Sequence, residues 1–111
     1  MNIIIKGTNL ELTEAIKNYA NLKIFSVEKF YPGIISIKIE LERTTRHHQK
    51  GALWRAEANA IVPRRLIRAE ATDKDLYAAI DAVKDELKRE FRAIRAKTRT
   101  KRLRQSRARI N

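Results

Sequence analysis

The chain has 111 residues, 43% of them apolar, and its 25 Lys and Arg against 13 Asp and Glu give a formal net charge of +12. This length and apolar content predict one globular domain, and the lack of cysteine excludes a disulfide scaffold, a thiolate metal site and a cysteine nucleophile. The longest apolar run, Leu76 to Ile80, is too short to span a bilayer, and the N-terminus has no signal-peptide layout, so we expect a cytoplasmic protein.

The first half of the chain predicts a strand, a helix and a second strand. A short β-branched run over 2–6 indicates the first strand, and Thr13 before an acidic residue is typical of a helix N-cap. Apolar residues at helical spacing then predict an amphipathic helix over 14–30, which Tyr31-Pro32-Gly33 ends. Strict alternation over 35–42 predicts a half-buried strand with one wet face.

The second half predicts two more strands and a long helix. A polar loop over 44–51 precedes alternating strands over 54–62 and 66–71, joined by a tight turn at Pro63-Arg64-Arg65. Thr72-Asp73 is expected to open the last helix, whose core stripe is Leu76, Ile80, Val83, Leu87, Phe91 and Ile94. The order βαβββα predicts an α+β fold, with a four-stranded sheet, a parallel first strand pair and both helices on one face.

The positive charge is concentrated at the end of the chain. Residues 1–87 hold 14 basic and 12 acidic side chains, whereas residues 88–109 hold eleven basic ones against Glu90 alone. We therefore expect a domain over residues 1–97 and a basic tail over residues 98–111, either a frayed helix end or, in isolation, a disordered segment. Such asymmetry favours a polyanionic partner, most often nucleic acid and less often an anionic membrane.

Nothing in the sequence indicates catalysis. The chain has no P-loop, no Rossmann glycine pattern and no nucleophile elbow. Asp81 and Asp85 stand one turn apart, and we interpret them as helix ion pairs with Lys84 and Arg89. His47-His48 has no third ligand nearby, so these two are either loop contacts to RNA or plain loop residues. We expect no enzyme activity, no cofactor, no metal and no small-molecule substrate.

The last helix carries a one-sided basic stripe beside its core stripe. On a helical wheel one flank holds Lys84, Lys88, Arg92, Arg95, Arg99 and Arg102, and the other flank holds Glu86 and Glu90. A line of cations suits phosphates that recur along a backbone, so we predict shape and phosphate recognition of folded RNA. Lys23, within the apolar stripe of the first helix, either snorkels to the rim or extends this phosphate surface.

Several segments with a recognisable pattern follow one another in order over roughly residues 2–97. They are Gly7-Thr8-Asn9, Leu12-Thr13-Glu14-Ala15-Ile16, Lys23, Val27-Glu28-Lys29-Phe30, His47-His48-Gln49-Lys50-Gly51, Arg55-Ala56-Glu57, Arg68-Ala69-Glu70-Ala71 and, most specifically, Asp75-Leu76-Tyr77-Ala78-Ala79-Ile80-Asp81 with Asp85, Leu87 and Arg89. With these segments the chain resembles the ribosome hibernation-promoting factors, also called ribosome-associated inhibitor or ribosomal subunit interface proteins. The chain departs from the family at Glu86, Glu90 and Ala93, where members often carry a basic residue, a glutamine and a lysine.

The resemblance implies a fold similar to double-stranded-RNA-binding domains. It also implies binding to the rRNA of the small ribosomal subunit in the decoding channel, where the protein would overlap tRNA and mRNA positions and stop translation under stress. The chain looks like a short form without the dimerisation domain of long members, so we expect it to silence ribosomes without pairing them. A separate ribosome-dimerising factor as a further partner stays open.

The resemblance implies RNA-contact roles for Lys23, Lys29, Lys88, Arg89 and Lys97, and the helical wheel adds Lys84, Arg92 and Arg95. With the tail, the candidate RNA-binding residues are Lys23, Lys29, Lys84, Lys88, Arg89, Arg92, Arg95, Lys97, Arg99, Lys101, Arg102 and Arg104, and the candidate loop contacts are Arg46, His47, His48, Arg64 and Arg65.

Two alternatives remain. One is a general double-stranded-RNA-binding or RNA-chaperone module, because basic charge alone selects no target. The other is a regulator that docks on protein through the open sheet face. Cross-strand ion pairs expected on that face argue against the second alternative, and the residues concerned are Lys38, Glu40, Arg55, Glu57, Arg68 and Glu70.

Overall fold

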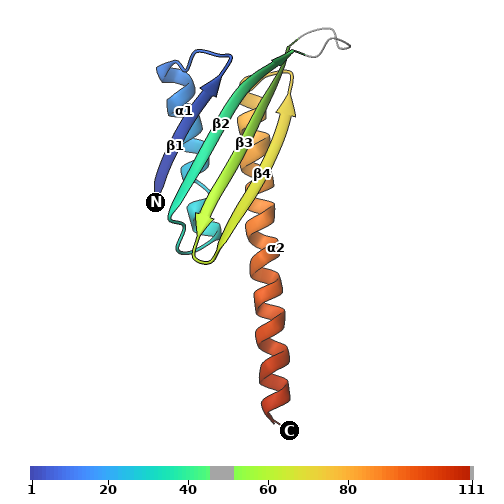
Figure 1. Cartoon of the computed structure of the whole chain (residues 1–111). Coiled ribbons are helices and arrows are strands. Elements are labelled where there is room, and N and C mark those ends of the chain that lie inside the picture. The colour runs from blue at the N-terminus through green and yellow to red at the C-terminus, as the bar shows by residue number, and fades with distance from the viewer. Residues whose placement is uncertain (46–51, 111) are drawn as a thin grey trace.

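The structure, a computed structural model, describes residues 1–45 and 52–110 (Figure 1). Its elements are β1 (Asn2–Thr8), α1 (Glu14–Phe25), a single 3-10 turn η1 (Glu28–Phe30), β2 (Ser36–Thr45), β3 (Ala52–Val62), β4 (Arg65–Asp73) and α2 (Leu76–Ile110). The strands form one sheet in the order β1-β2-β3-β4, in which β1 pairs parallel with β2 and the other pairs are antiparallel. The predicted βαβββα order and parallel first pair are confirmed.

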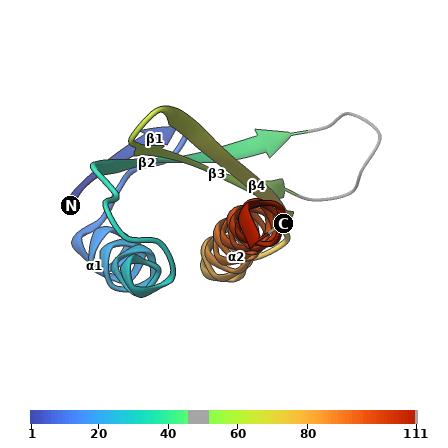
Figure 2. The same cartoon turned by 90° about the horizontal axis from the view of Figure 1, so that it is seen from below.

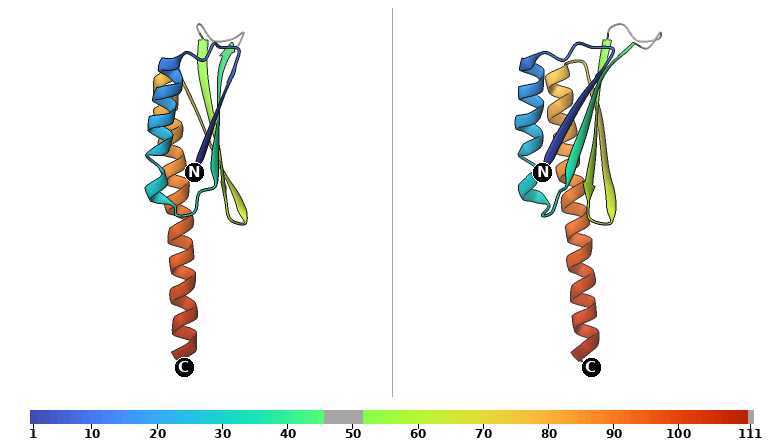
Figure 3. Two further views of the ribbon diagram at one scale, coloured as in Figure 1. Left: turned by 90° about the vertical axis from the view of Figure 1, so that its left-hand side faces the viewer. Right: turned by 60° about the vertical axis from the view of Figure 1, so that its left-hand side comes forward.

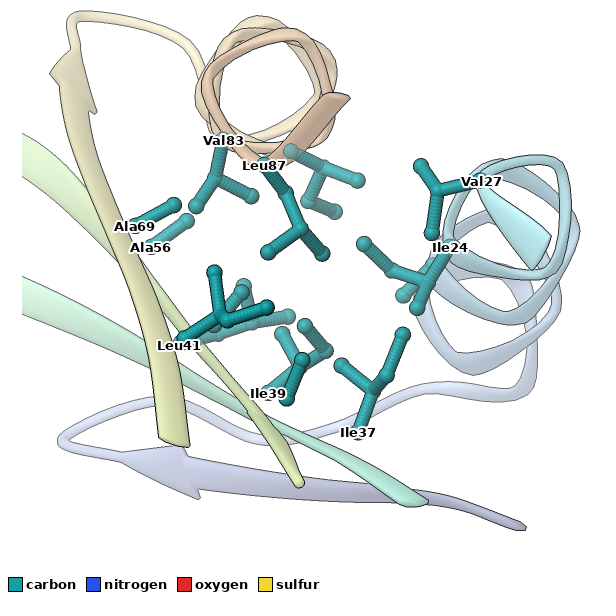
Figure 4. Packing of buried hydrophobic residues seen from close by; sticks show 14 of the residues in the cluster. Ile24, Val27, Ile37, Ile39, Leu41, Ala56, Ala69, Val83 and Leu87 are labelled. Carbon is teal, nitrogen blue, oxygen red and sulfur yellow. The ribbon is translucent and has the colours of Figure 1, made fainter. Parts of the chain in front are cut away.

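Both helices lie on the same face of the sheet, as expected from strands with one apolar side (Figure 2). Alternation along β2 turns Ile37, Ile39 and Leu41 inward, where all three are fully buried. β3 contributes small alanines to the same face, which allows α2 to approach closely and to bury Leu87 (Figure 4). Phe91, about one turn further along α2, is fully buried as well. The core therefore fixes which side of α2 faces the sheet and which sides remain outside.

The first helix begins where the sequence predicts and ends five residues earlier. The Ile16 backbone N–H donates to the Thr13 hydroxyl at 3.2 Å, which confirms the N-cap. α1 then ends at Phe25, because the Ser26 hydroxyl donates to the Lys23 carbonyl at 2.5 Å and the chain tightens into η1. Gly33, with a φ of 81°, makes the turn into β2.

The expected start of the last helix at Thr72-Asp73 is wrong, because these residues complete β4 against β3. The helix begins at Leu76, and its N-terminal groups are satisfied by Asp75: the carboxylate accepts from the Ala78 N–H at 3.2 Å and the carbonyl accepts from the Ala79 N–H at 2.9 Å. β-branched Thr72 favours the strand, and the cap moves to the next suitable residue.

Past the end of the sheet, α2 continues alone (Figure 3). The structure has helix through Ile110, where the sequence predicts a frayed helix end or a disordered tail. Lys, Arg, Leu and Gln are good helix formers, and no Gly or Pro interrupts residues 98–110. Within the described residues, no helix combines the length and apolar character that crossing a membrane requires. The division of the chain at residue 97 and the disorder of the free tail stay predictions.

Candidate RNA interface

Phe30 of η1 gathers cations between the two helices. The ring of Phe30 is half-buried, and three cations lie near its centroid: the Lys88 Nζ at 4.8 Å, the Arg92 guanidinium carbon at 5.0 Å and the Lys29 Nζ at 5.3 Å. Arg95 donates to the Phe30 carbonyl at 3.4 Å. Cations over an aromatic face are attracted by its quadrupole, so the ring offsets part of their mutual repulsion. Phe30 therefore organises this part of the surface.

A basic flank runs along α2 from this ring, and it comprises Lys88, Arg92, Arg95, Arg99 and Arg102. Tyr31 and Pro32, directly after η1, form the opposite wall, and the Tyr31 ring lies against Phe91 at 5.2 Å between centroids. The groove between them has a volume of about 340 Å³ and is lined by Tyr31, Pro32, Ile94, Arg95, Thr98, Arg99 and Arg102. The structure thus brings five of the six predicted flank residues together beside η1.

The cations of the basic flank are free of carboxylates. In the described part of the chain, none of its five side chains takes part in an ion pair. Four of the five are exposed and Lys88 is half-buried. From residue 88 to residue 102 the flank extends for about 21 Å at 1.5 Å per residue. It therefore offers a line of unneutralised N–H donors to an external polyanion.

Three predicted contact residues are neutralised instead. The Lys84 Nζ lies 3.0 Å from Asp85, the Lys23 Nζ lies 3.6 Å from Asp81, and Arg89 donates to Glu86 at 2.5 Å. The pairs expected one turn apart, Asp81 with Lys84 and Asp85 with Arg89, are not among the ion pairs of the described residues. Lys84 contacts its neighbour Asp85 instead, and the charge of Arg89 is taken by Glu86, one of the residues that depart from the family.

Asp81 of α2 pairs with residues of α1 and not with a residue of its own helix. Besides the Lys23 ammonium, it accepts a hydrogen bond from the Tyr19 hydroxyl at 2.7 Å. This hydrogen bond raises the pKa of Tyr19, because it holds the phenolic proton beside a carboxylate. Lys23 therefore bridges α1 to α2, with its Nζ 5.4 Å from the centroid of the Tyr19 ring, and its contact to RNA stays a prediction.

The outer face of the sheet carries charges that neutralise one another. Arg55 contacts Glu57 and lies 2.7 Å from Glu70 and 3.6 Å from Glu42, and Arg68 contacts Glu57 at 2.5 Å. Four of the six residues expected in cross-strand pairs are confirmed there. No ion pair of the described residues includes the other two, Lys38 and Glu40.

Glu57 is the centre of this network and only 6% exposed. Hydrogen bonds from Asn59, Arg68 and Arg55 stabilise its charged form and lower its pKa to about 2. The bond to Glu70 in turn raises the pKa of Arg55, and the pKa of Glu70 is lowered by the same contact. The sheet face is thus held by internal pairs in which Arg55 and Arg68 are already engaged.

The remaining predicted contacts lie elsewhere. Lys97, Lys101 and Arg104 share a different side of α2, around a hollow with Ala96 and Thr100. Arg64, in left-handed conformation with a φ of 70°, turns the β3–β4 hairpin at the end of the sheet from which α2 emerges (Figure 1). Arg65 is the first residue of β4 and pairs with Val62 of β3. The candidate contacts Arg46, His47 and His48 lie outside the described residues.

Comparison with known proteins identifies one family. The family model described as Sigma 54 modulation protein / S30EA ribosomal protein matches residues 3–99. A ribosome hibernation promotion factor of Deinococcus radiodurans is 33% identical over 94 residues, which cover 84% of this chain and 48% of that protein. A ribosome hibernation promoting factor of Klebsiella oxytoca is 32% identical over 93 residues, covering 82% of this chain and 90% of that protein. The chain therefore spans about half the length of the first relative and most of the second.

Solved structures agree with this fold. The crystal structure of the N-terminal domain of Thermus thermophilus Protein Y superposes with a TM-score of 0.71 and 33% identity, covering 85% of this chain and 99% of that one. A ribosomal subunit interface protein from Coxiella burnetii gives a TM-score of 0.70 at 20% identity, covering 86% of this chain and 99% of that one, a likeness of fold alone.

Proposed function

Since the chain belongs to the Sigma 54 modulation protein / S30EA ribosomal protein family, we propose that it is a ribosome hibernation factor that represses translation under stress. Its partner is the small ribosomal subunit, and its ligand there is rRNA in the decoding channel. The names of the relatives describe ribosome hibernation and specify no catalysed reaction, which supports action by binding alone.

The observation that carries this proposal is the contrast in free charge between the two faces. The five cations of the basic flank have no carboxylate partner in the described chain, whereas the arginines of the sheet face are paired. Phosphate recognition needs cations whose donors are still available. The helical side of the domain is therefore the side that meets RNA.

The mechanism is occlusion. The core clamps both helices to one sheet, so the domain enters the channel as a rigid wedge about 31 × 19 Å in cross-section. The basic flank neutralises phosphates along the channel wall, and the body occupies the volume that tRNA and mRNA need. No bond is made or broken, and no cofactor is required.

The experiment that tests this proposal adds the full chain to purified ribosomes and to a translation reaction. We expect the protein to sediment with small subunits in a sucrose gradient and to reduce translation at equimolar amounts. Because phosphate contacts release counterions, the logarithm of the binding constant is expected to fall linearly with the logarithm of salt concentration.

Competition distinguishes this function from a general RNA-binding module. A perfect RNA duplex added at equal mass is expected to leave most of the protein on the small subunit. If the duplex instead removes the protein completely, the chain is a general double-stranded-RNA binder. If the protein sediments alone, the ribosomal proposal is wrong. The same gradients show whether ribosomes pair, either with the chain alone or after addition of a dimerising factor.

A further inference from the structure

The part of α2 beyond the sheet carries two rows of cations. We define the extension as residues 95–105, all exposed. Its near row, Arg95, Arg99 and Arg102, continues the basic flank and lines the groove beside Tyr31 and Pro32. Its far row, Lys97, Lys101 and Arg104, lines a separate hollow that contains only residues of α2.

The two rows face opposite ways. In each case a far-row residue follows a near-row residue by two positions, as Lys101 follows Arg99 and Arg104 follows Arg102. Two positions turn a helix by about 200°, so the side chains of each such pair leave the axis about 160° apart. A flat anionic surface can engage only one of these rows at a time.

The extension cannot balance its own charge. Glu90 is the last acidic residue of the chain, so every near neighbour of these cations on the helix is neutral or basic. Like charges three and four residues apart destabilise an isolated helix. Both rows are therefore better satisfied by external anions, on two sides of the helix.

Folded RNA fits this requirement better than a membrane does. A helix with its side chains is about 10–12 Å across, and a helical junction or a widened groove of folded RNA presents phosphate backbones on both sides of such a body, whereas the regular A-form grooves are too narrow or too shallow. An interfacial helix instead needs a broad apolar face opposite its cations. Leu103, 56% exposed, is the one large apolar side chain on the extension.

From this arrangement we propose that the extension is a second RNA-contact element, which inserts between two phosphate backbones and binds one with each row. The proposal deepens the hibernation function and rests on it for the identity of the RNA. The family model ends at residue 99, so most of the far row lies beyond the segment shared with the family. The extension thus adds RNA contacts beyond those of the wedge.

The test compares three double variants of the full chain, each with two charges removed. R99Q/R102Q weakens the near row, K101Q/R104Q weakens the far row, and K6Q/K38Q removes two exposed cations from the sheet side as a matched control. Glutamine keeps helix propensity close to that of Lys and Arg, and circular dichroism verifies the helix content of each variant. Binding is measured across a salt series with purified small subunits and with a 20-base-pair RNA duplex.

Two-sided binding predicts that the near and far variants each lower the salt slope by about 1.4–1.8, and that their combination lowers it by the sum. The control is expected to change the slope by less than about 0.5. Hydroxyl-radical footprinting then shows protection of two facing backbones by the unmodified chain, and the far variant loses one of them. A far variant that matches the control on both RNAs overturns the inference.

The outcomes separate this inference from the proposed function. If the chain binds small subunits and only the near row matters, hibernation stands and the two-sided extension falls. If both rows matter on duplex RNA but small subunits are not bound, the extension stands and the ribosomal target falls. If the far row matters only on vesicles that contain phosphatidylglycerol, the extension is a membrane element and the inference is wrong.

Discussion

The outer sheet face and the basic flank of α2 use the same residue types for opposite purposes. On the sheet, Arg55 and Arg68 converge on Glu57, which is 6% exposed. On the helix, Arg92, Arg95 and their neighbours meet an aromatic ring, a carbonyl and solvent. The sheet arginines hold the protein together, and the helix arginines remain available to a partner.

Net charge does not distinguish these two roles. The formal charge of +12 counts an arginine in a network and an arginine on an open flank alike. The local number of carboxylates within reach decides which one can bind RNA. Substitutions that add carboxylates to the basic flank or remove them from the sheet network test this difference between the two regions directly.

The largest effect is expected from reversing charges on the basic flank. K88E/R92E/R95E places three carboxylates against phosphates and is expected to weaken binding to small subunits at least 100-fold, about 2.7 kcal/mol. The control K6E/K38E/K74E changes the net charge equally, on exposed positions away from the flank, and should cost at least tenfold less. Salt-dependent sedimentation measures both. Equal losses in the two variants would show that total charge, rather than the flank, drives binding.

The second largest effect concerns stability. E57Q leaves Arg55 and Arg68 around a neutral group, so the free energy of unfolding at pH 7 is expected to fall by about 2 kcal/mol. RNA binding should be unchanged. Because the folded pKa of Glu57 is about 2, below the value of about 4.3 in an unfolded chain, its stabilisation is present above pH 4.3 and is lost toward pH 2.

Urea unfolding between pH 7 and pH 2 measures this difference. The gap between E57Q and the unmodified chain should close as the pH falls through this window. The exposed Glu11 gives the control E11Q, for which no gap is expected. A gap that persists unchanged at pH 2 would mean that the ionisation of Glu57 contributes nothing to stability.

A smaller effect is expected at the aromatic centre of the flank. F30L keeps an apolar side chain but removes the ring that faces three cations, so binding to small subunits should weaken about three- to fivefold, within the 0.5–1 kcal/mol typical of exposed cation–π contacts. F30Y retains a ring and is expected to restore binding. Equal binding by F30L and F30Y would assign Phe30 a packing role only. Titration of small subunits with labelled protein gives the affinities.

The smallest effect is expected at the bridge between the helices. D81N releases the Lys23 ammonium, so binding should strengthen by at most about twofold while stability falls by less than about 1 kcal/mol. The same change removes the carboxylate that raises the pKa of Tyr19. Ultraviolet titration should therefore show one tyrosine ionising at lower pH than in the unmodified chain. An unchanged tyrosine titration would contradict the assigned hydrogen bond.

The fold could be predicted because its signals are local. Alternation in β2, β3 and β4 and the helical stripe through Ile80 and Phe91 each specify one buried face, and these faces have only one consistent arrangement. The errors fall at element ends. α1 stops at Phe25 and α2 starts at Leu76 because of caps by Ser26 and Asp75, where helix and turn geometries compete within a few residues.

The candidate site was only partly predictable. A wheel of α2 places the basic flank correctly because it needs nothing beyond the helix itself. It cannot show that Lys23 pairs with Asp81, or that Phe30 faces Lys88. These contacts depend on how α1 and η1 pack against α2. The only sign of them in the sequence is the basic residue next to Phe30.

Because α2 runs without a break from the core into the extension, the core fixes the orientation of the extension about the helix axis. The buried side chains of Leu87 and Phe91 hold the first half of α2 against the sheet, and no break in the helix separates that half from the far row. Each residue inserted after Ile94 would rotate the far row by about 100° relative to the sheet, whereas an insertion of seven would return it to within about 20°. The direction in which the far row points is thus set by the number of residues between it and the core. Insertions or deletions in this part of α2 are therefore enough to change that direction during evolution.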